Sequence, residues 1–236
     1  MATGAKITGS VTRWWWVRHA PVPNPERRCY GQSDKDCDVS NEELFRHQAK
    51  LLPRGAVWYA SNLLRARKTA EQLAKAGAEM DRLNIDPDLA EQHFGDWQGL
   101  TYIEIAENHA NNHLFWLGPP EYRPPGGESW ADVILRLRSL MDTVSLHYAG
   151  MRVMIVAHQV VVLCLRYIIE TLDEARILEI DRAGDVANCG VTEYRFDPAH
   201  GRHGGLALVR YNETAPVEEG AVSVTGAPDP IVAVRG

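Results

Sequence analysis

Residues Val11–Ala20 read VTRWWWVRHA, an apolar run that ends abruptly on a basic pair. Three consecutive tryptophans suit a strand that is buried on both of its faces, so we expect a strand over Val11–Val17. A proline-rich loop, Pro21–Pro25, follows the basic pair. The stretch therefore predicts a central strand whose carboxyl end carries Arg18 and His19.

Two more apolar runs end on polar, chemically capable residues. Ala56–Ala60 leads into Ser61, and Arg65 follows one helical turn later. Val153–Ala157 ends directly on His158. We expect both runs to form buried strands that lie parallel to the first.

Strands and helices alternate along the rest of the chain, as apolar spacing, capping residues and helix breakers indicate. The remaining expectations are helices from Ser40 to about Leu52, from about Leu63 to Gly77, from Thr101, from Ser129 and from Gln159 to about Glu170, strands over Val191–Phe196 and Leu206–Tyr211, and loops over Asp86–Gly99 and Gly118–Gly127. Ser40 and Thr101 carry the capping-box pattern of a helix start. This alternation predicts an α/β fold, a three-layer sandwich with a mostly parallel central sheet flanked by helices.

Composition favours one domain with a small ligand. The chain has 236 residues, and no Gly-, Ser- or Pro-rich linker divides it. The net charge is −6 with scattered Lys and Arg, which argues against a nucleic-acid partner. No apolar run has the length of a membrane span, and the first ten residues lack the apolar core of a secretory signal. The four cysteines form no CxxC pair, so we expect reduced thiols in a cytoplasmic protein. We also expect no contact with a membrane.

The three strand ends predict one functional site. Ligands of open α/β sheets bind beyond the carboxyl ends of the strands, so Arg18, His19, Arg65 and His158 are expected to converge there. Helix starts at the same edge direct backbone N–H groups toward an anion. Arginine matches two phosphate oxygens with its planar fork of donors, and neutral histidine can act as a nucleophile. Glu91, in a later loop, offers the carboxyl group that a leaving oxygen needs.

Each residue also has a simpler interpretation. Arg65 could pair with Glu71 or Asp86 on the surface, and His158 could be a satisfied core histidine. His109 and His113 lie four residues apart, but no flanking carboxylate completes a zinc motif, so we expect no metal.

Five segments in order resemble the histidine phosphatase superfamily, which includes cofactor-dependent phosphoglycerate mutases, fructose-2,6-bisphosphatase and α-ribazole phosphatase. These segments are VRHA (17–20), SNLLRARKTA (61–70), EQHFGDWQG (91–99), PGGES (125–129) and IVAHQ (155–159). The resemblance covers about residues 12–211. It implies a phosphoglycerate mutase-like fold in a single domain spanning residues 1–236, with a core of about 12–211 and a C-terminal extension over 212–236.

The resemblance implies roles for matched positions. His19 would be the phosphorylated nucleophile, and Arg18, Arg65 and His158 would bind the phosphoryl group. Glu91 would be the proton donor, which requires a raised pKa. The other ring nitrogen of His19 would be held by a hydrogen bond to a backbone carbonyl. No metal or organic cofactor is implied.

The chain departs from the family pattern at three places. Ala20 replaces the usual Gly after the nucleophile, a small change unless that residue needs a positive φ. Gln159 replaces the Gly after the second histidine, but its backbone N–H is retained for phosphate binding. Pro25 stands where mutases have Asn, and Asn24 lies one residue early.

Loops are expected to shape the entrance to the site, because binding residues concentrate in loops. The candidate substrate-lining residues are Asn24, Tyr30, Gln32, Trp116 and Arg123.

The resulting hypothesis is a phosphomonoester hydrolase that acts on a small phosphorylated metabolite through a phosphohistidine on His19. One alternative is a phosphoglycerate mutase-type phosphotransferase, which the missing Glu-Ser pattern after His19 disfavours. The other is a non-catalytic phospho-ligand binding module on the same fold, which the full set of catalytic side chains disfavours. The resemblance allows a homodimer, and the sequence does not identify the substrate.

Overall fold

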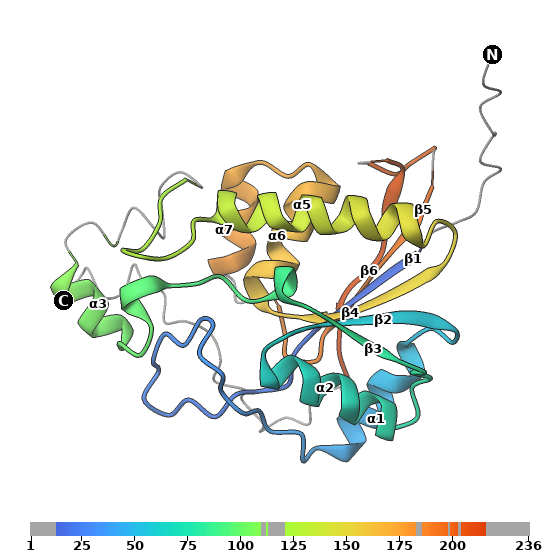
Figure 1. Ribbon diagram of the computed structural model, residues 1–236, viewed down its shortest axis with the longest axis horizontal. Helices are drawn as coiled ribbons and strands as arrows, with labels where there is room; N and C mark the ends of the chain where they lie inside the picture. The colour runs from blue at the N-terminus through green and yellow to red at the C-terminus, as the bar shows by residue number, and fades with distance from the viewer. Residues whose placement is uncertain are drawn as a thin grey trace.

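A six-stranded sheet in the order β3-β2-β4-β1-β5-β6 forms the centre of the molecule (Figure 1). The computed structural model describes residues 13–109, 112, 121–182, 186–197, 199–202 and 204–215. The strands are β1 Arg13–Arg18, β2 Ala56–Ser61, β3 Leu83–Asp86, β4 Arg152–Ala157, β5 Val191–Phe196 and β6 Leu206–Glu213. The four strands β3, β2, β4 and β1 are parallel, and β5 and β6 are antiparallel to their neighbours. The prediction of a mostly parallel central sheet is confirmed.

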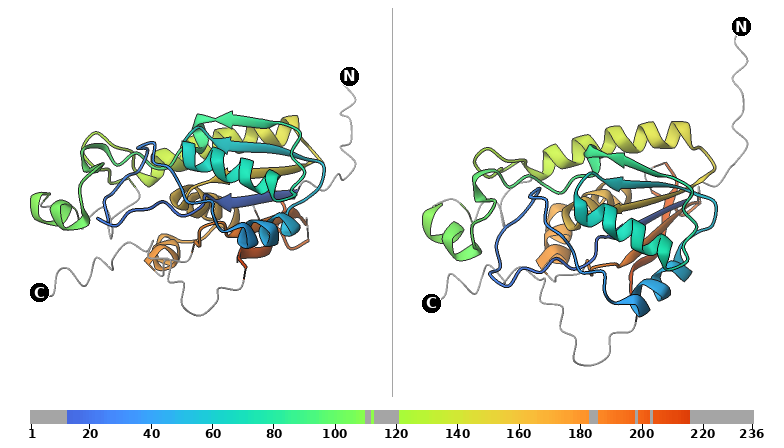
Figure 2. Two further views of the ribbon diagram at one scale, coloured as in Figure 1. Left: turned by 90° about the horizontal axis from the view of Figure 1, so that it is seen from below. Right: turned by 60° about the horizontal axis from the view of Figure 1, so that its bottom comes forward.

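Helices cover both faces of this sheet. The helices are α1 Glu42–Leu51, α2 Leu64–Lys75, α3 Tyr102–Asn108, α5 Trp130–His147, α6 Gln159–Glu170 and α7 Glu174–Arg182, with short 3-10 helices at Pro87–Leu89 (η1) and Gly95–Trp97 (η2). In Figure 1, α5 and α6 lie on one side of the sheet and α1 and α2 on the other, and the turned views of Figure 2 agree. The three-layer sandwich is therefore confirmed. Among the described residues, no helix has both the length and the apolar character that crossing a bilayer requires.

The tryptophan run of β1 explains how the layers are joined. Trp14 and Trp16 pack with α5 and α6 on one face, whereas Trp15 packs with α1 and α2 on the other. All three side chains are buried. A strand that is covered on both faces has no polar side, which is why its sequence is continuously apolar.

Trp16 provides a stability test of this central strand. Its side chain is fully buried, and its ring centroid lies 4.9 Å from that of Tyr194 on β5. We expect Trp16→Ala to lower the free energy of unfolding in urea by about 3–5 kcal/mol, because it leaves a large cavity. Leu135→Ala, on an exposed position of α5, is the control, with an expected change within about 0.5 kcal/mol. Equal effects of the two substitutions would contradict this packing.

Several expected boundaries differ from the structure. The cap of α1 is Asn41, whose side chain accepts from the Leu44 N–H, and not Ser40. Two adjacent residues with capping side chains make such a shift of one position invisible in sequence. Strand β6 ends at Glu213, two residues beyond Tyr211. Residues 11 and 12 of the expected first strand, and 216–236 of the expected extension, lie outside the described residues.

Strand β3 and helix α7 were not expected from the sequence, and the expected loop Asp86–Gly99 contains the 3-10 helices η1 and η2. Strand β3 has only four residues and lies at the sheet edge, so it lacks a long apolar run. Its last residue, Asp86, was expected to begin a loop. Helix α7 is short and has a weakly apolar sequence, although Ile177 and Ile180 are buried against α6. Other helix starts agree with expectation, since Thr101 and Ser129 both form complete capping boxes.

Candidate active site

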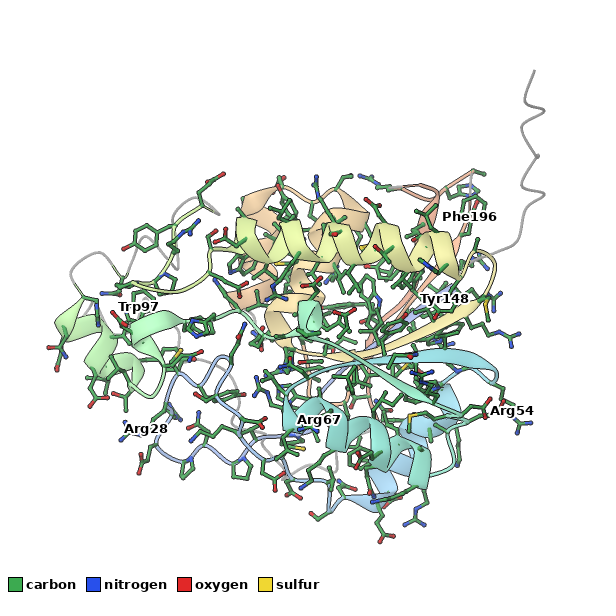
Figure 3. The ribbon with its side chains drawn as sticks, in the orientation of Figure 1. Arg28, Arg54, Arg67, Trp97, Tyr148 and Phe196 are labelled. Carbon is green, nitrogen blue, oxygen red and sulfur yellow. The ribbon has the colours of Figure 1, made fainter. Side chains whose placement is uncertain are left out.

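The carboxyl ends of the three central strands meet at one edge of the sheet. Strand β4 lies between β1 and β2, and Arg18 is level with Ala157. In Figure 3, Arg54 and Tyr148, which precede β2 and β4, lie at one end of the molecule, and Trp97 lies near α3 at the other. The parallel strands therefore run toward the end that carries α3. We call the residues that follow or end these strands, Arg18, His19, Arg65 and His158, the basic cluster.

The two histidines of the basic cluster face each other. Their ring centroids are 5.1 Å apart with an interplanar angle of 56°, and both side chains are at most 1% exposed. Burial, followed by the nearby charges of Arg65 and Arg18, holds the pKa of His19 well below its ordinary value of 6.5. Burial, Arg65 and His19 do the same for the pKa of His158. Both rings are therefore neutral near pH 7.

A backbone carbonyl determines which nitrogen of His19 carries the lone pair. The Nδ1 atom lies 2.7 Å from the Ala20 carbonyl oxygen. A carbonyl can only accept, so Nδ1 carries the proton and Nε2 carries the lone pair. The main chain of His19 is also held: its N–H donates to the Ala157 carbonyl at 2.9 Å, and its carbonyl accepts from the Asn188 side-chain amide at 2.8 Å. His19 thus presents an unprotonated ring nitrogen in a fixed orientation.

His158 lies at the start of α6. Among the residues that the structure describes, neither of its ring nitrogens has a hydrogen-bond partner. It occupies the N-cap position, and Gln159 is the first residue of the helix. The first N–H groups of a helix carry partial positive charge, so they add to the field of the basic cluster. This arrangement suits an anion with several oxygen acceptors.

Backbone carbonyls anchor both arginines. Arg65 donates from Nη1 to Ser33 at 2.9 Å and from Nη2 to Gly31 at 2.6 Å, and Arg18 donates to the Val186 carbonyl. Arg65 is fully buried and Arg18 is 5% exposed. Carbonyl acceptors fix the guanidinium groups without supplying a formal negative charge. Two buried positive charges therefore remain available to an anionic ligand.

Glu91 is the acidic residue of the site. It is 7% exposed, and burial raises its pKa above 4.5, opposed by the charges of Arg65, Arg18 and Arg136. Its Oε1 accepts from the Gln92 N–H at 3.0 Å. Its charged neighbours include both arginines of the basic cluster, Arg65 and Arg18. A buried carboxyl with a raised pKa can hold a proton for transfer.

Of the expected lining residues, Tyr30 and Gln32 contact residues of the site, whereas Asn24 does not do so in the described contacts. The Tyr30 ring lies 5.0 Å from the Arg65 guanidinium carbon, and the Gln32 side chain donates to the Glu91 carbonyl at 2.8 Å. The Asn24 side-chain amide instead donates to the Arg28 carbonyl and accepts from the Arg28 N–H, so it stabilises its own loop.

Two further candidates lie elsewhere. Arg123 is exposed and forms an ion pair with Asp132 at 3.1 Å, and none of its contacts with the described residues reaches the basic cluster. Trp116 and His113 lie outside the described residues, and the ring of His109 packs on that of Trp97 at 5.6 Å. Arg65 forms an ion pair with neither Glu71 nor Asp86 among the described contacts, because its donors face Gly31 and Ser33.

Thr69 supports the site, although the sequence did not assign it a role. Its hydroxyl accepts from the Ala20 N–H at 2.8 Å and donates to the Arg65 carbonyl at 2.7 Å. It therefore joins the loop after His19 to the helix that carries Arg65. Ala20 is not among the residues with positive φ, so the Ala in place of Gly carries no backbone strain.

Removing the Thr69 hydroxyl is expected to destabilise the protein. Thr69→Val keeps the shape but leaves the buried Ala20 N–H without an acceptor, which costs about 1–3 kcal/mol. Chemical denaturation measures this loss, and Thr69→Ser, which retains the hydroxyl, should recover most of it. A Val variant as stable as the Ser variant would show that this bridge contributes nothing.

The sequence of this chain is similar to those of known proteins. The family model of the histidine phosphatase superfamily (branch 1) matches residues 14–214. A bifunctional protein of Mycobacterium tuberculosis is 37% identical over 160 residues, which are 66% of this chain and 43% of that protein. This chain thus spans less than half of that relative. A metal-independent phosphoserine phosphatase of Arabidopsis thaliana is 29% identical over 192 residues, 79% of this chain and 77% of that protein.

Solved structures agree with the sequence comparison. A structure described as mycobacterial hydrolase 2 has a TM-score of 0.73 at 26% identity and covers 89% of this chain and 94% of its own. The native structure of a mycobacterial glucosyl-3-phosphoglycerate phosphatase has a TM-score of 0.71 at 25% identity, with 86% and 99% covered. The family model spans most of the chain, and the folds agree along nearly the whole length of both solved structures. The chain belongs to the histidine phosphatase superfamily.

Proposed function

We propose that this protein hydrolyses phosphomonoesters of small metabolites through a phosphohistidine formed on Nε2 of His19. The observation that carries this proposal is the hydrogen bond from Nδ1 to the Ala20 carbonyl, with His158 across from the same ring. It gives His19 a lone pair on the nitrogen available for attack. Membership of the superfamily and the phosphatase names of several relatives support the same chemistry.

In the first step, the phosphoryl group lies between the two arginines and His158. Nε2 of His19 attacks phosphorus in line, the N–P bond forms, and the bond from phosphorus to the ester oxygen breaks. Glu91 transfers its proton to that leaving oxygen. The positive charge that develops on the His19 ring is stabilised through Nδ1–H by the Ala20 carbonyl.

In the second step, water replaces the alcohol. The Glu91 carboxylate takes a proton from water, and the water oxygen attacks phosphorus. The N–P bond breaks, His19 returns to its neutral form, and phosphate leaves. The basic cluster holds the same three phosphoryl oxygens in both steps, so one binding site serves both transfers.

The pH profile follows from the two pKa shifts. His19 must be neutral to attack, so activity is lost as pH falls through its pKa, which lies below 6.5. Glu91 must be protonated in the first step, so activity is lost as pH rises through its pKa, which lies above 4.5. We expect a bell-shaped profile of kcat/KM for an alkyl phosphate, with an alkaline limb that disappears in Glu91→Gln. An alkaline limb that persists in this variant would assign that limb to another group.

The product distinguishes a hydrolase from a mutase. A panel of phosphorylated sugars, glycerates and amino acids, assayed in water enriched in oxygen-18, should release phosphate that carries one solvent oxygen. Transfer to a second hydroxyl of the substrate without phosphate release would favour the mutase alternative. Binding without turnover of any panel member would favour a non-catalytic module.

The substrate class, location and assembly are parts of the same proposal. Relatives include enzymes named for glucosyl-3-phosphoglycerate and for phosphoserine, so a phosphate ester that also bears a carboxylate is the first class to assay. We infer a single catalytic domain in the cytoplasm, which the four free, buried cysteines support. A homodimer stays a prediction, and light scattering of the purified chain tests it.

A further inference from the structure

The ion pair of Arg136 and Glu128 lies outside the basic cluster and contacts the loop that carries Glu91. Arg136 lies on α5, and Glu128 lies just before that helix. Nε and Nη2 of Arg136 donate to the two carboxylate oxygens of Glu128 at 3.0 and 3.2 Å. The exposed fractions of the two side chains are 15% and 26%. A two-point contact of this kind fixes direction as well as distance.

The same guanidinium also binds the Glu91 loop. Arg136 donates from Nη1 to the Asp88 carbonyl and from Nη2 to the Glu91 carbonyl at 3.3 Å. The Glu91 carbonyl therefore has two donors, because Gln32 also binds it. Arg136 thus holds the loop both before Glu91 and at Glu91 itself.

Glu128 holds the loop on its other side. Its Oε2 accepts from the His93 N–H at 2.9 Å, and its own N–H donates to the His93 carbonyl at 2.8 Å. Its carbonyl accepts from the Gln92 side chain at 2.7 Å. The ion pair therefore forms hydrogen bonds with the segment 88–93 both before and after Glu91.

We infer that Glu128 and Arg136 are positioning residues that hold the Glu91 carboxyl at the leaving oxygen. This inference rests on the proposed function. Neither residue transfers a proton, because Arg136 is always charged and the Glu128 carboxylate already accepts from four donors, which are Nε and Nη2 of Arg136, the His93 N–H and the Gln32 amide. Their effect on the reaction passes through Glu91, since a shift of about 1 Å in a catalytic group can cost about 100-fold in rate.

The leaving group reports on this role. A proton donor matters most for an alkyl phosphate, whose alkoxide is a poor leaving group, and least for p-nitrophenyl phosphate, whose phenolate leaves unaided. Because Glu91 also activates water in the second step, the test uses the rate of alcohol or nitrophenol release in a single turnover, which reports the first step alone. We expect Arg136→Met to lower this rate for the alkyl ester by about 30- to 100-fold and for the aryl ester by at most about threefold. The affinity for either ester should change little, because the basic cluster is intact.

Two further variants keep the test decisive. Glu128→Gln conserves shape, weakens the ion pair and should show the same selective loss, even if Arg136→Met folds poorly. In a Glu91→Gln background, Arg136→Met should add less than about threefold for the alkyl ester, because the group it positions is already absent. Additive losses in that double variant would overturn the inference.

Arg166 and Glu170 provide a matched control. They form a similarly shielded ion pair at 2.8 Å on α6, beside Tyr194 and Tyr211, with no contact to Glu91. We expect Arg166→Met to lower stability without changing the ratio of the alkyl to the aryl single-turnover rate. Equal losses of the single-turnover rate for the two esters in Arg136→Met would refute positioning while leaving the proposed function intact. Hydrolysis that survives the loss of His19 would instead refute the proposed function.

Discussion

Replacing His19 with Asn is expected to lower turnover of every phosphomonoester by on the order of 10⁴-fold or more, since the nucleophile is lost. Asn is the chosen residue because its side-chain amide can still donate to the Ala20 carbonyl. The variant also retains the two main-chain hydrogen bonds of residue 19, one from its N–H to the Ala157 carbonyl and one from the Asn188 amide to its carbonyl. Steady-state assays with alkyl and aryl phosphates measure the effect.

The loss in this variant must be chemical and not structural. Thermal unfolding should therefore remain close to that of the unaltered protein, and inorganic phosphate should still protect the variant through Arg18, Arg65 and His158. Turnover within about tenfold of the original rate would mean that no covalent bond to His19 is required.

Glu91→Gln is expected to have the second largest effect, a fall of about 10²- to 10⁴-fold in kcat for alkyl phosphates. Gln has the size of Glu and keeps an oxygen for the Gln92 N–H, but it has no acidic proton to transfer. For p-nitrophenyl phosphate, the first step should be nearly unaffected. The burst of nitrophenol release separates that step from the second one, which still needs a base.

Stability gives the control for Glu91→Gln. Burial raises the pKa of Glu91, so ionising it in the folded protein is costly and folding is favoured by its protonated form. This contribution to the free energy of unfolding is present at low pH and is lost as pH rises through the folded-state pKa of Glu91. The Gln variant should therefore lose less stability than the original chain as pH rises above 4.5. Parallel falls in stability would contradict a raised pKa for Glu91.

The central strands and their ends could be read from the sequence because the signals are local. The tryptophan run must be buried on both faces, and His19 and His158 follow their strands directly. Parallel strands place such residues at a common edge, so the basic cluster follows from order along the chain. A hydrogen bond from the second ring nitrogen of His19 to a backbone carbonyl was also expected, because a nucleophilic histidine needs one fixed tautomer, and the structure shows that this carbonyl belongs to Ala20.

Other features depend on contacts that no local pattern encodes. Arg136 looks like a polar interruption of an apolar helix face, and its partners at Asp88 and Glu91 lie 48 and 45 residues away in sequence. Asn24 and Arg123 were selected because they occur in loops, but nearby groups satisfy their side chains. Strand β3 forms because β2 offers it an edge to pair with, and not because of its own four residues.

Trapping the intermediate tests the central claim most directly. The purified protein is mixed with a radiolabelled phosphomonoester and quenched in alkali within the first turnover, and labelled peptides are then identified by mass spectrometry. We expect label that is stable to alkali and labile to acid on the peptide that contains His19, and no label in the His19→Asn variant. Rapid phosphate release with no labelled protein, or label on His158 or another residue, would contradict the mechanism.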